Sequence, residues 1–563
     1  MNNIIKSFCL AALFPVLLFF LSTGAAAAPA DDPGELEAFI DGVIYNQMDE
    51  HKIVGATLSI VQDGEIILSK GYGYADRENK VPVGPAKTLF RPGSTSKLFT
   101  WTAVMQLVEQ GLIDLDTDIN EYLDFEIPDE FYGRNEAGSP GPITMAHLLT
   151  HTPGFEDKGE GLFVLTTEEM LTLEDYLKKN IPARVFPPGE VMAYSNYGTA
   201  LAGYIVELVA GVPFAEYVEK NIYEPLGMEQ STFRQPLPDE LEPYMAGGYS
   251  FFNGTYHRGS FEYISGLPAG SMSSTAEDLA RFMIAHLQEG RYEDRRILEE
   301  STAREMHSRQ FTHHPKQDGM TYGFIEQSIN NKRVINHGGN TFLFATGCYL
   351  LPEENMGLFV SYNGGTGIER EALFTAFMDR FYPAPEADKA VPPEGSRERA
   401  AAFTGEYQPN RSNFSTMEKL LNLLSGVRVS VDQEGYLLVN LLDYPQHFVE
   451  AEPGVYERRY SEGTDLVKKI VFVEDSAGRM MLCGEGPTFT YTKPPWYGTG
   501  TMAGFLTGSN LLLVLTAAAG WIYASAGRVI RKEKSGAPKA ALAARLSTIF
   551  YGLFTVVVNA SLS

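Results

Sequence analysis

The sequence predicts an α/β domain, followed by a small all-β domain and by transmembrane helices at the C-terminus. Three observations predict this order. Residues 32–382 mix helical and strand patterns, residues 400–495 contain short strand patterns, and residues 501–526 contain no charged side chain. A chain of 563 residues is also too long for one hydrophobic core, so we expect two or three domains.

The first 28 residues have the pattern of a secretory signal peptide. Lys6 supplies a positive start, residues 8–21 are apolar, and small residues at 26–30 form a cleavage site. An uncleaved membrane anchor is the alternative interpretation. Cys9 stands at the start of the apolar stretch, which makes it a poor site for lipid attachment. A signal peptide directs the following domain out of the cytoplasm.

Residues 32–382 hold the mixed patterns of the first domain. Residues 55–73 alternate apolar and polar side chains around a turn at Asp63-Gly64, which predicts a β-hairpin. Ser94 opens a predicted helix that runs to about Gln110, with Gly111 as its stop. The further predictions are a helix over 199–210, a capped helix over 279–287, and strands over 348–351 and 358–361.

A linker is predicted at residues 383–399, which are rich in proline, alanine and charge. The next segment, residues 400–495, begins its strand patterns with Val427, Val429 and Val431 and continues after a turn. Short strands at this spacing predict a small barrel or sandwich. We expect no catalytic constellation in this domain.

The C-terminal segment predicts membrane spans. Residues 501–526 are long enough to cross roughly 30 Å of hydrocarbon as a helix, and aromatic residues flank them as interfacial side chains do. Residues 527–545 are basic, and such a loop belongs in the cytoplasm, so the preceding domains face the outside. Residues 546–563 are apolar and predict a second transmembrane helix that is cut short. The predicted location is therefore the cell membrane, with one or two spans.

Charge and metal-ligand patterns exclude several partners. The chain carries 45 basic and 71 acidic side chains, and all but one of the acidic side chains lie between the signal peptide and residue 500. This argues against nucleic-acid binding and against docking on anionic lipid through that surface. Cys348 and Cys483 are predicted as buried free thiols in preference to a disulfide. His147 and His151 have metal-pair spacing, but no glutamate follows His147, so neither a metal nor a cofactor is expected.

Three short motifs carry the chemistry. The first is Ser94-Thr95-Ser96-Lys97, which presents a hydroxyl and an amine on one face of a helix. The second is Tyr194-Ser195-Asn196, with a phenol and an amide, and the third is His337-Gly338-Gly339, with an imidazole beside two residues that lack side chains. Together these are the parts of a serine acyl-transfer site: a nucleophile, bases, an orienting amide and a backbone edge.

Each motif has a simpler interpretation when it is taken alone. Ser94 would cap a helix and Lys97 would be a solvated residue of its first turn. Tyr194 would be a turn or core aromatic, and the two glycines would form an ordinary turn. A lysine in the first turn is unfavourable to the helix dipole, which counts against the first of these interpretations.

The motif segments together resemble one family. Residues 90–97 read Phe90-Arg91-Pro92-Gly93-Ser94-Thr95-Ser96-Lys97 and resemble the nucleophile segment of the penicillin-recognising serine hydrolases, in the branch of class C β-lactamases, D-alanyl-D-alanine peptidases and related esterases. The second and third motifs match those of the family, and residues 143–154 and 268–279 resemble its framework. The resemblance covers about residues 35–380. It implies an antiparallel sheet flanked by helices, with an all-helical subdomain.

The resemblance also implies catalytic roles. Ser94 attacks the substrate carbonyl and forms an acyl-enzyme. Lys97 and Tyr194 share the proton transfer, with the nearby ammonium lowering the phenol pKa from its usual value near 10. Asn196 holds Lys97 and the substrate amide.

The third motif supplies the oxyanion hole and departs from the β-lactamase form. The oxyanion donors are the N–H groups of Ser94 and of Asn340, which follows Gly339 on an edge strand. Gly338 and Gly339 let an extended substrate lie against this strand. In β-lactamases a lysine and a hydroxyl of this motif bind the antibiotic carboxylate. Here His337 stands in place of the lysine, and Gly338 lacks the hydroxyl. His337 titrates near neutrality, so its charge depends on its neighbours, and it contacts substrate or relays a proton to Tyr194.

The sequence therefore predicts a membrane-anchored serine hydrolase outside the cytoplasm that acts on a D-amino-acid peptide, amide or ester. A D-alanyl peptidase or D-aminopeptidase is favoured, and the substrate is a small molecule or peptide, including cell-wall peptide or a β-lactam. A β-lactamase or carboxylesterase of the same family is the alternative. Two other classes are a non-catalytic penicillin-binding sensor and a structural envelope protein. The role of the all-β domain and the oligomeric state are not predicted.

Overall fold

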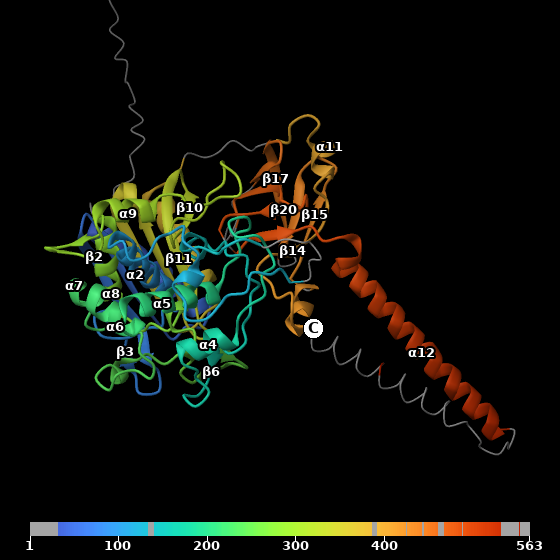
Figure 1. Cartoon of the computed structure of the whole chain (residues 1–563), viewed down its shortest axis with the longest axis horizontal. Coiled ribbons are helices and arrows are strands. Elements are labelled where there is room, and N and C mark those ends of the chain that lie inside the picture. The colour runs from blue at the N-terminus through green and yellow to red at the C-terminus, as the bar shows by residue number, and fades with distance from the viewer. Residues whose placement is uncertain are drawn as a thin grey trace, which may run out of the picture.

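The computed structural model describes residues 32–132, 140–384, 391–423, 425–441, 444–459, 467–486, 488–530 and Tyr551. They form two packed domains and a long C-terminal helix (Figure 1). The predicted signal peptide, most of the predicted basic loop and all of the predicted second span except Tyr551 lie outside the described residues.

Seven antiparallel strands form the central sheet of the first domain, in the order β10-β11-β12-β13-β1-β2-β3. The strands are β1 (Gly55–Gln62), β2 (Glu65–Asp76), β3 (Val81–Pro82), β10 (Ile325–Ile329), β11 (Lys332–Asn340), β12 (Ala345–Leu351) and β13 (Met356–Tyr362). Asp63 and Gly64 both have positive φ, as the turn of the predicted β1–β2 hairpin requires. Since β1 pairs with β13, the N-terminal hairpin completes a sheet that the chain resumes only after residue 324.

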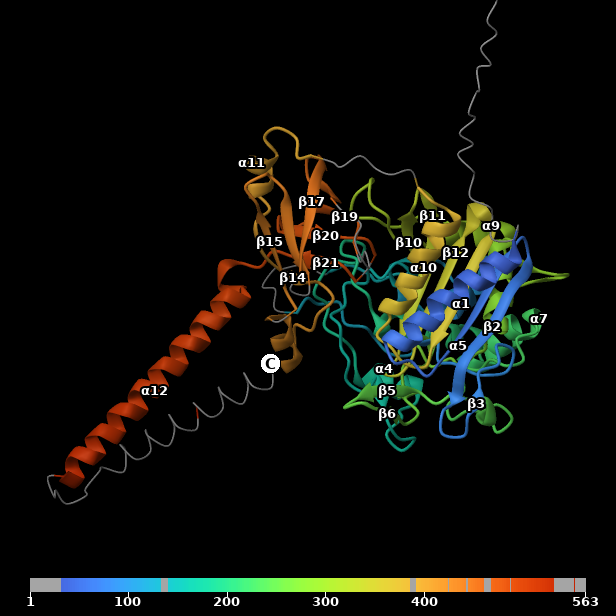
Figure 2. The same ribbon diagram turned by 180° about the vertical axis from the view of Figure 1, so that it is seen from behind.

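Helices cover both faces of this sheet. Helices α1 (Pro33–Glu50) and α10 (Ile368–Phe381) pack on one face (Figure 2), and α8 (Ala276–Leu287) packs on the other. Next to α8 lies a helical region that contains α2 (Lys97–Glu109), α3 (Met145–Leu149), α4 (Leu173–Lys179), α5 (Asn196–Ala210), α6 (Phe214–Val218), α7 (Glu224–Leu226) and α9 (Glu300–His307). Three small two-stranded sheets join β4 (Phe163–Val164) to β7 (Tyr263–Ile264), β5 (Tyr249–Phe252) to β6 (Thr255–Arg258), and β8 (Arg291–Tyr292) to β9 (Arg295–Arg296). The predicted α/β fold is confirmed.

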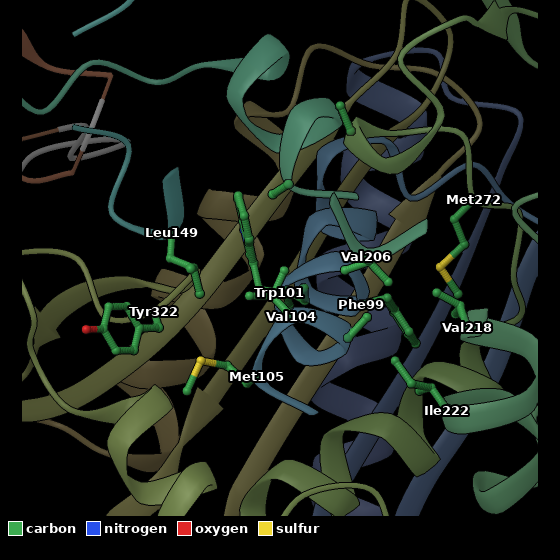
Figure 3. Packing of buried hydrophobic residues seen from close by; sticks show 14 of the residues in the cluster. Phe99, Trp101, Val104, Met105, Leu149, Val206, Val218, Ile222, Met272 and Tyr322 are labelled. Atoms are coloured by element: carbon green, nitrogen blue, oxygen red, sulfur yellow. The ribbon is translucent and has the colours of Figure 1, made fainter. Parts of the chain in front are cut away.

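Helix α2 runs through the larger hydrophobic core of this domain. Every residue from Lys97 to Leu107 is buried, so the helix contacts protein on all sides. Phe99 stacks on Phe282 of α8 with ring centroids 3.9 Å apart, and Trp101 and Met105 lie among side chains of other helices (Figure 3). Because close packing leaves α2 no freedom to shift, it also fixes the turn that immediately precedes it.

The second domain is a closed barrel, which confirms the predicted small all-β domain. Its strands are β14 (Gly405–Pro409), β15 (Val427–Val431), β16 (Leu437–Leu441), β17 (Tyr444–Glu452), β18 (Val455–Arg458), β19 (Lys469–Glu474), β20 (Met480–Cys483) and β21 (Thr490–Thr492). A short helix that was not predicted, α11 (Ser396–Ala401), overlaps the end of the predicted linker and buries Ala400 in the barrel core.

Helix α12 (Gly500–Ile530) follows the barrel and projects away from it (Figure 1). Its segment Gly500–Tyr523 is long and apolar enough to cross a membrane, by length and composition. Cys348 and Cys483 are buried free thiols in different domains.

We expect Leu149→Ala to lower the free energy of unfolding of the first domain by about 2–5 kcal/mol, because Leu149 is fully buried in the core around α2. Urea unfolding followed by tryptophan fluorescence measures this loss. Leu165→Ala is the matched control, since Leu165 is 62% exposed and its loss should change stability by under about 0.5 kcal/mol. Equal effects of the two substitutions would contradict this packing.

Candidate active site

Ser94 lies in a 3₁₀ turn, Gly93–Ser96, directly before α2. The helix predicted to open at Ser94 thus begins only at Lys97, because the chain first makes this tighter turn. Thr95 Oγ1 donates a hydrogen bond to the carbonyl of His337 (3.1 Å), which ties the turn to β11. The first motif and the third motif are therefore held together.

The Lys97 side chain is fully buried and lies among three acceptors. Its Nζ is 3.2 Å from Ser94 Oγ, 2.8 Å from Asn196 Oδ1 and 2.5 Å from the carbonyl oxygen of Ala269. Burial holds the Lys97 pKa well below its usual 10.5, and the charge of Arg411 lowers it further. Burial thus favours an uncharged amine, which lies in contact with the Ser94 hydroxyl.

Tyr194 precedes α5, whose N-cap is Ser195 and whose first residue is Asn196. The Tyr194 ring is buried, 4.4 Å from the ring of His151 and 6.0 Å from that of His337. Burial raises the pKa of the Tyr194 phenol, and the nearby Ser94 hydroxyl and Arg411 guanidinium offset only part of this rise. The expected lowering of this pKa by Lys97 is therefore wrong, because an uncharged amine does not stabilise a phenolate.

Strand β11 carries the third motif and has an open edge. β10 pairs with β11 only as far as Asn336, and within the described residues no strand pairs with 337–340 on that side. β11 is thus an inner strand with one uncovered end, which corrects the prediction of an edge strand. On the other side, the Thr341 amide donates to the carbonyl of Phe344 (2.9 Å). Since alternate residues of an antiparallel ladder face opposite edges, the amide of Asn340 faces the open one.

Both glycines of the motif allow close contacts within the protein. A Cβ on Gly339 would lie 1.9 Å from the carbonyl oxygen of Pro92 and 2.8 Å from the amide nitrogen of Ser94. A Cβ on Gly338 would lie 2.7 Å from Arg370 Nη2, which comes from α10. The prediction that these glycines serve an extended substrate therefore misses their first role, which is to let the nucleophile turn and Arg370 approach β11.

His337 is uncharged in this setting. Its side chain is buried, its Nδ1 lies 2.7 Å from the carbonyl oxygen of Gly338, and its Nε2 has no hydrogen-bond partner among the described residues. Burial is the main cause that lowers its pKa, to about 3. The expectation of titration near neutrality is therefore wrong.

The three motifs border one cavity of about 400 Å³. Seven of the eight predicted site residues line this cavity: Ser94, Tyr194, Asn196, His337, Gly338, Gly339 and Asn340. The eighth, Lys97, is hydrogen-bonded to Ser94 and Asn196.

Sequence reasoning missed other residues that line the cavity, notably Arg370, Glu371, Arg411 and Thr488. Arg411 and Thr488 belong to the barrel domain, where no catalytic constellation was expected and whose role was not predicted. Arg370 and Glu371 lie in α10, whereas Arg411 and Thr488 lie in irregular segments. None of the four belongs to a recognisable motif, so no sequence signal could have found them.

The histidine pair at metal-like spacing has a structural role. His147 Nδ1 accepts a hydrogen bond from the amide of Thr144 (3.1 Å), and His151 Nδ1 accepts one from the amide of Ser195 (3.2 Å). These imidazoles thus support the segments that lead into α3 and α5.

Comparison with known proteins identifies relatives of the first domain. The Beta-lactamase family model matches residues 40–377. Protein flp of Staphylococcus aureus (strain N315) is 25% identical over 333 residues, which are 58% of this chain and 62% of flp. The match thus spans less than two thirds of that relative. The putative penicillin-binding protein PbpX of Bacillus subtilis (strain 168) is 33% identical over 193 residues, covering 34% of this chain and 44% of PbpX.

Solved structures are similar beyond the first domain. The octameric penicillin-binding protein homologue from Pyrococcus abyssi aligns with a TM-score of 0.53 and 24% identity, over 81% of this chain and all of that chain. At this identity the likeness concerns the fold.

We expect the His337 imidazole to stay neutral from pH 8 down to about pH 5, because its pKa is lowered to about 3. Hydrogen–deuterium exchange at the imidazole C2 position, read by mass spectrometry as a function of pH, gives the pKa of each histidine. His257, which is exposed, serves as the internal control. A transition of His337 near pH 6.5 would contradict the buried, uncharged state.

Proposed function

The chain belongs to the Beta-lactamase family of serine hydrolases, and we propose that it works outside the cytoplasm, anchored to the membrane, through an acyl-enzyme at Ser94. The observation that carries the mechanism is the contact between Lys97 Nζ and Ser94 Oγ at 3.2 Å in a fully buried setting. An amine that is uncharged at neutral pH is a competent general base.

The acylation step follows from this contact. Ser94 Oγ bonds to the substrate carbonyl carbon while its proton passes to the Lys97 nitrogen. The carbonyl electron pair moves to oxygen, and the amides of Ser94 and Asn340 donate to that oxyanion. Asn196 Oδ1 accepts a hydrogen bond from Lys97 Nζ at 2.8 Å, and Asn196 lines the cavity, where its amide can meet the substrate.

The leaving group then departs with the electrons of the broken bond and takes a proton. Tyr194, which is kept protonated by burial, is the proposed donor, and it recovers a proton from Lys97. A water molecule next attacks the acyl carbon and gives its proton to Lys97. The bond from the acyl carbon to Ser94 Oγ then breaks, and Lys97 returns the proton to that oxygen. His337 contributes an uncharged acceptor, Nε2, for a substrate N–H.

The proposed substrate is a D-amino-acid peptide, amide or ester, of the D-alanyl peptidase or D-aminopeptidase type. An extended peptide can pair with the open edge of β11 beside Ser94. A β-lactamase role is less favoured, because neutral His337 does not supply the cation that the lysine of β-lactamases gives to the antibiotic carboxylate.

Membrane attachment is proposed through α12. The segment Gly500–Tyr523 has the length and composition of a span, and Trp496 and Tyr497 precede it, as interfacial aromatics do. The barrel then lies between the membrane and the hydrolase domain.

We expect Ser94→Ala to lower kcat/KM by at least about 1,000-fold on any hydrolysed substrate, because the nucleophile is lost. Lys97→Arg should lower it at least about 100-fold, since a guanidinium does not accept the proton. Hydrolysis of D-alanyl peptides, a p-nitrophenyl ester and a chromogenic cephalosporin measures both effects.

The matched control is Ser308→Ala, which removes an exposed hydroxyl after α9 and should leave turnover unchanged. Turnover that survives Ser94→Ala would sink the mechanism. Stable labelling of Ser94 by a fluorescent penicillin, without turnover of any substrate, would instead indicate a penicillin-binding sensor.

A further inference from the structure

One residue of the barrel domain, Arg411, reaches the catalytic cavity. It lies between β14 and β15, and its guanidinium carbon is 4.8 Å from the centre of the Tyr194 ring. Its Nε donates to Asp157 of the hydrolase domain at 2.9 Å. The contact with Tyr194 brings Arg411 to the side chain proposed to protonate the leaving group.

The segment that carries Arg411 is fixed to the hydrolase domain by a buried acid. The carboxylate of Glu156 accepts hydrogen bonds from the amides of Phe414 (2.7 Å) and Ser415 (2.8 Å), from Ser415 Oγ (2.5 Å), and from the amide of Ala183 (3.1 Å). The amide of Asp157 donates to the carbonyl of Ser412 at 2.9 Å. Charge-assisted bonds to a buried carboxylate are strong, so this attachment is specific.

The rest of the domain interface supports the same placement. Thr490 Oγ1 donates to the carbonyl of Met192 (2.7 Å), and Gln317 Nε2 donates to that of Cys483 (2.8 Å). A shared apolar cluster buries side chains of both domains: Val185, Phe186 and Val191 with Val455, Val471, Met481 and Cys483. Arg411 is thus part of a packed interface.

Arg411 differs from the other charged residues of the cavity in its hydrogen bonds. The ionic side chains that line the cavity are Arg370, Glu371 and Arg411. Arg370 donates to Glu371 (3.1 Å), to the carbonyl of Gly339 (3.1 Å) and to the Asn340 side chain. By contrast, Asp157 accepts only from Nε of Arg411, and Nη1 and Nη2 make no hydrogen bond to the described residues. These two nitrogens form a planar fork of donors that matches a carboxylate.

We infer that Arg411 is a specificity-determining residue that binds a carboxylate of the substrate, so that the barrel domain forms part of the substrate site. The inference rests on the proposed function of Ser94. In this arrangement the barrel, through Arg411, recognises the substrate carboxylate, which neutral His337 and Gly338 do not bind. A peptide whose free carboxylate lies one residue beyond the scissile bond is small enough for a cavity of about 400 Å³.

The experiment compares an N-acetylated D-alanyl-D-alanine peptide with its C-terminal amide, on the full chain in detergent. Arg411→Gln should lower kcat/KM for the free acid about 10- to 100-fold, mainly through KM, because a charge-assisted pair is lost. The amide should change by less than about 3-fold. Arg411→Lys keeps the charge but loses the paired Nη donors. Its kcat/KM for the free acid should therefore lie between that of the unsubstituted protein and that of Arg411→Gln. Arg428→Gln, on an exposed residue of β15, is the control.

Binding to the Ser94→Ala protein, measured by calorimetry, separates this inference from the proposed chemistry. The free acid should bind at least about 10-fold more tightly than the amide, and Arg411→Gln should remove this difference. That result supports the inference even where no turnover is found. Equal losses for acid and amide, no loss for either, or no binding of the acid would overturn it.

Discussion

The site depends on the removal of water from one amine. Lys97 is the first residue of α2 and is fully buried, and a charged ammonium in such a setting costs several kcal/mol, so its pKa is lowered. The same burial keeps Tyr194 protonated and His337 uncharged. The hydrophobic core thus sets the protonation state of the groups around Ser94, and the tight packing of α2 determines both stability and chemistry.

Close backbone approach is the second requirement of the site. Gly339 lets the turn that holds Ser94 lie against β11, and Gly338 makes room for the guanidinium of Arg370. The end of β10 at Ile325 leaves the neighbouring edge of β11 open beside this turn. The nucleophile, the two proposed oxyanion donors and a strand edge are therefore brought together by three features that are local in space and distant in sequence.

The predictable features were those with a pattern in the chain. Asp63-Gly64 between alternating runs predicted the β1–β2 hairpin, alternating valines predicted β15, and three motifs predicted residues that the fold collects around one cavity. The pKa directions of Tyr194 and His337 could not be predicted, because they depend on burial, which only the tertiary structure sets. Arg411 carries no motif, and its proximity to Tyr194 comes from packing between domains.

The topology of the barrel affects the order in which the parts of the substrate site are assembled during folding. Arg411 lies between β14 and β15, and β14 must pair with β21, the last strand, before the barrel closes. The hydrolase domain precedes the barrel in the chain, so it can fold first, because domains form as units during synthesis. Arg411 reaches its cavity only after β21, the last barrel strand, has been made. Newly made molecules therefore pass through a stage in which Ser94 is already in place but Arg411 is not.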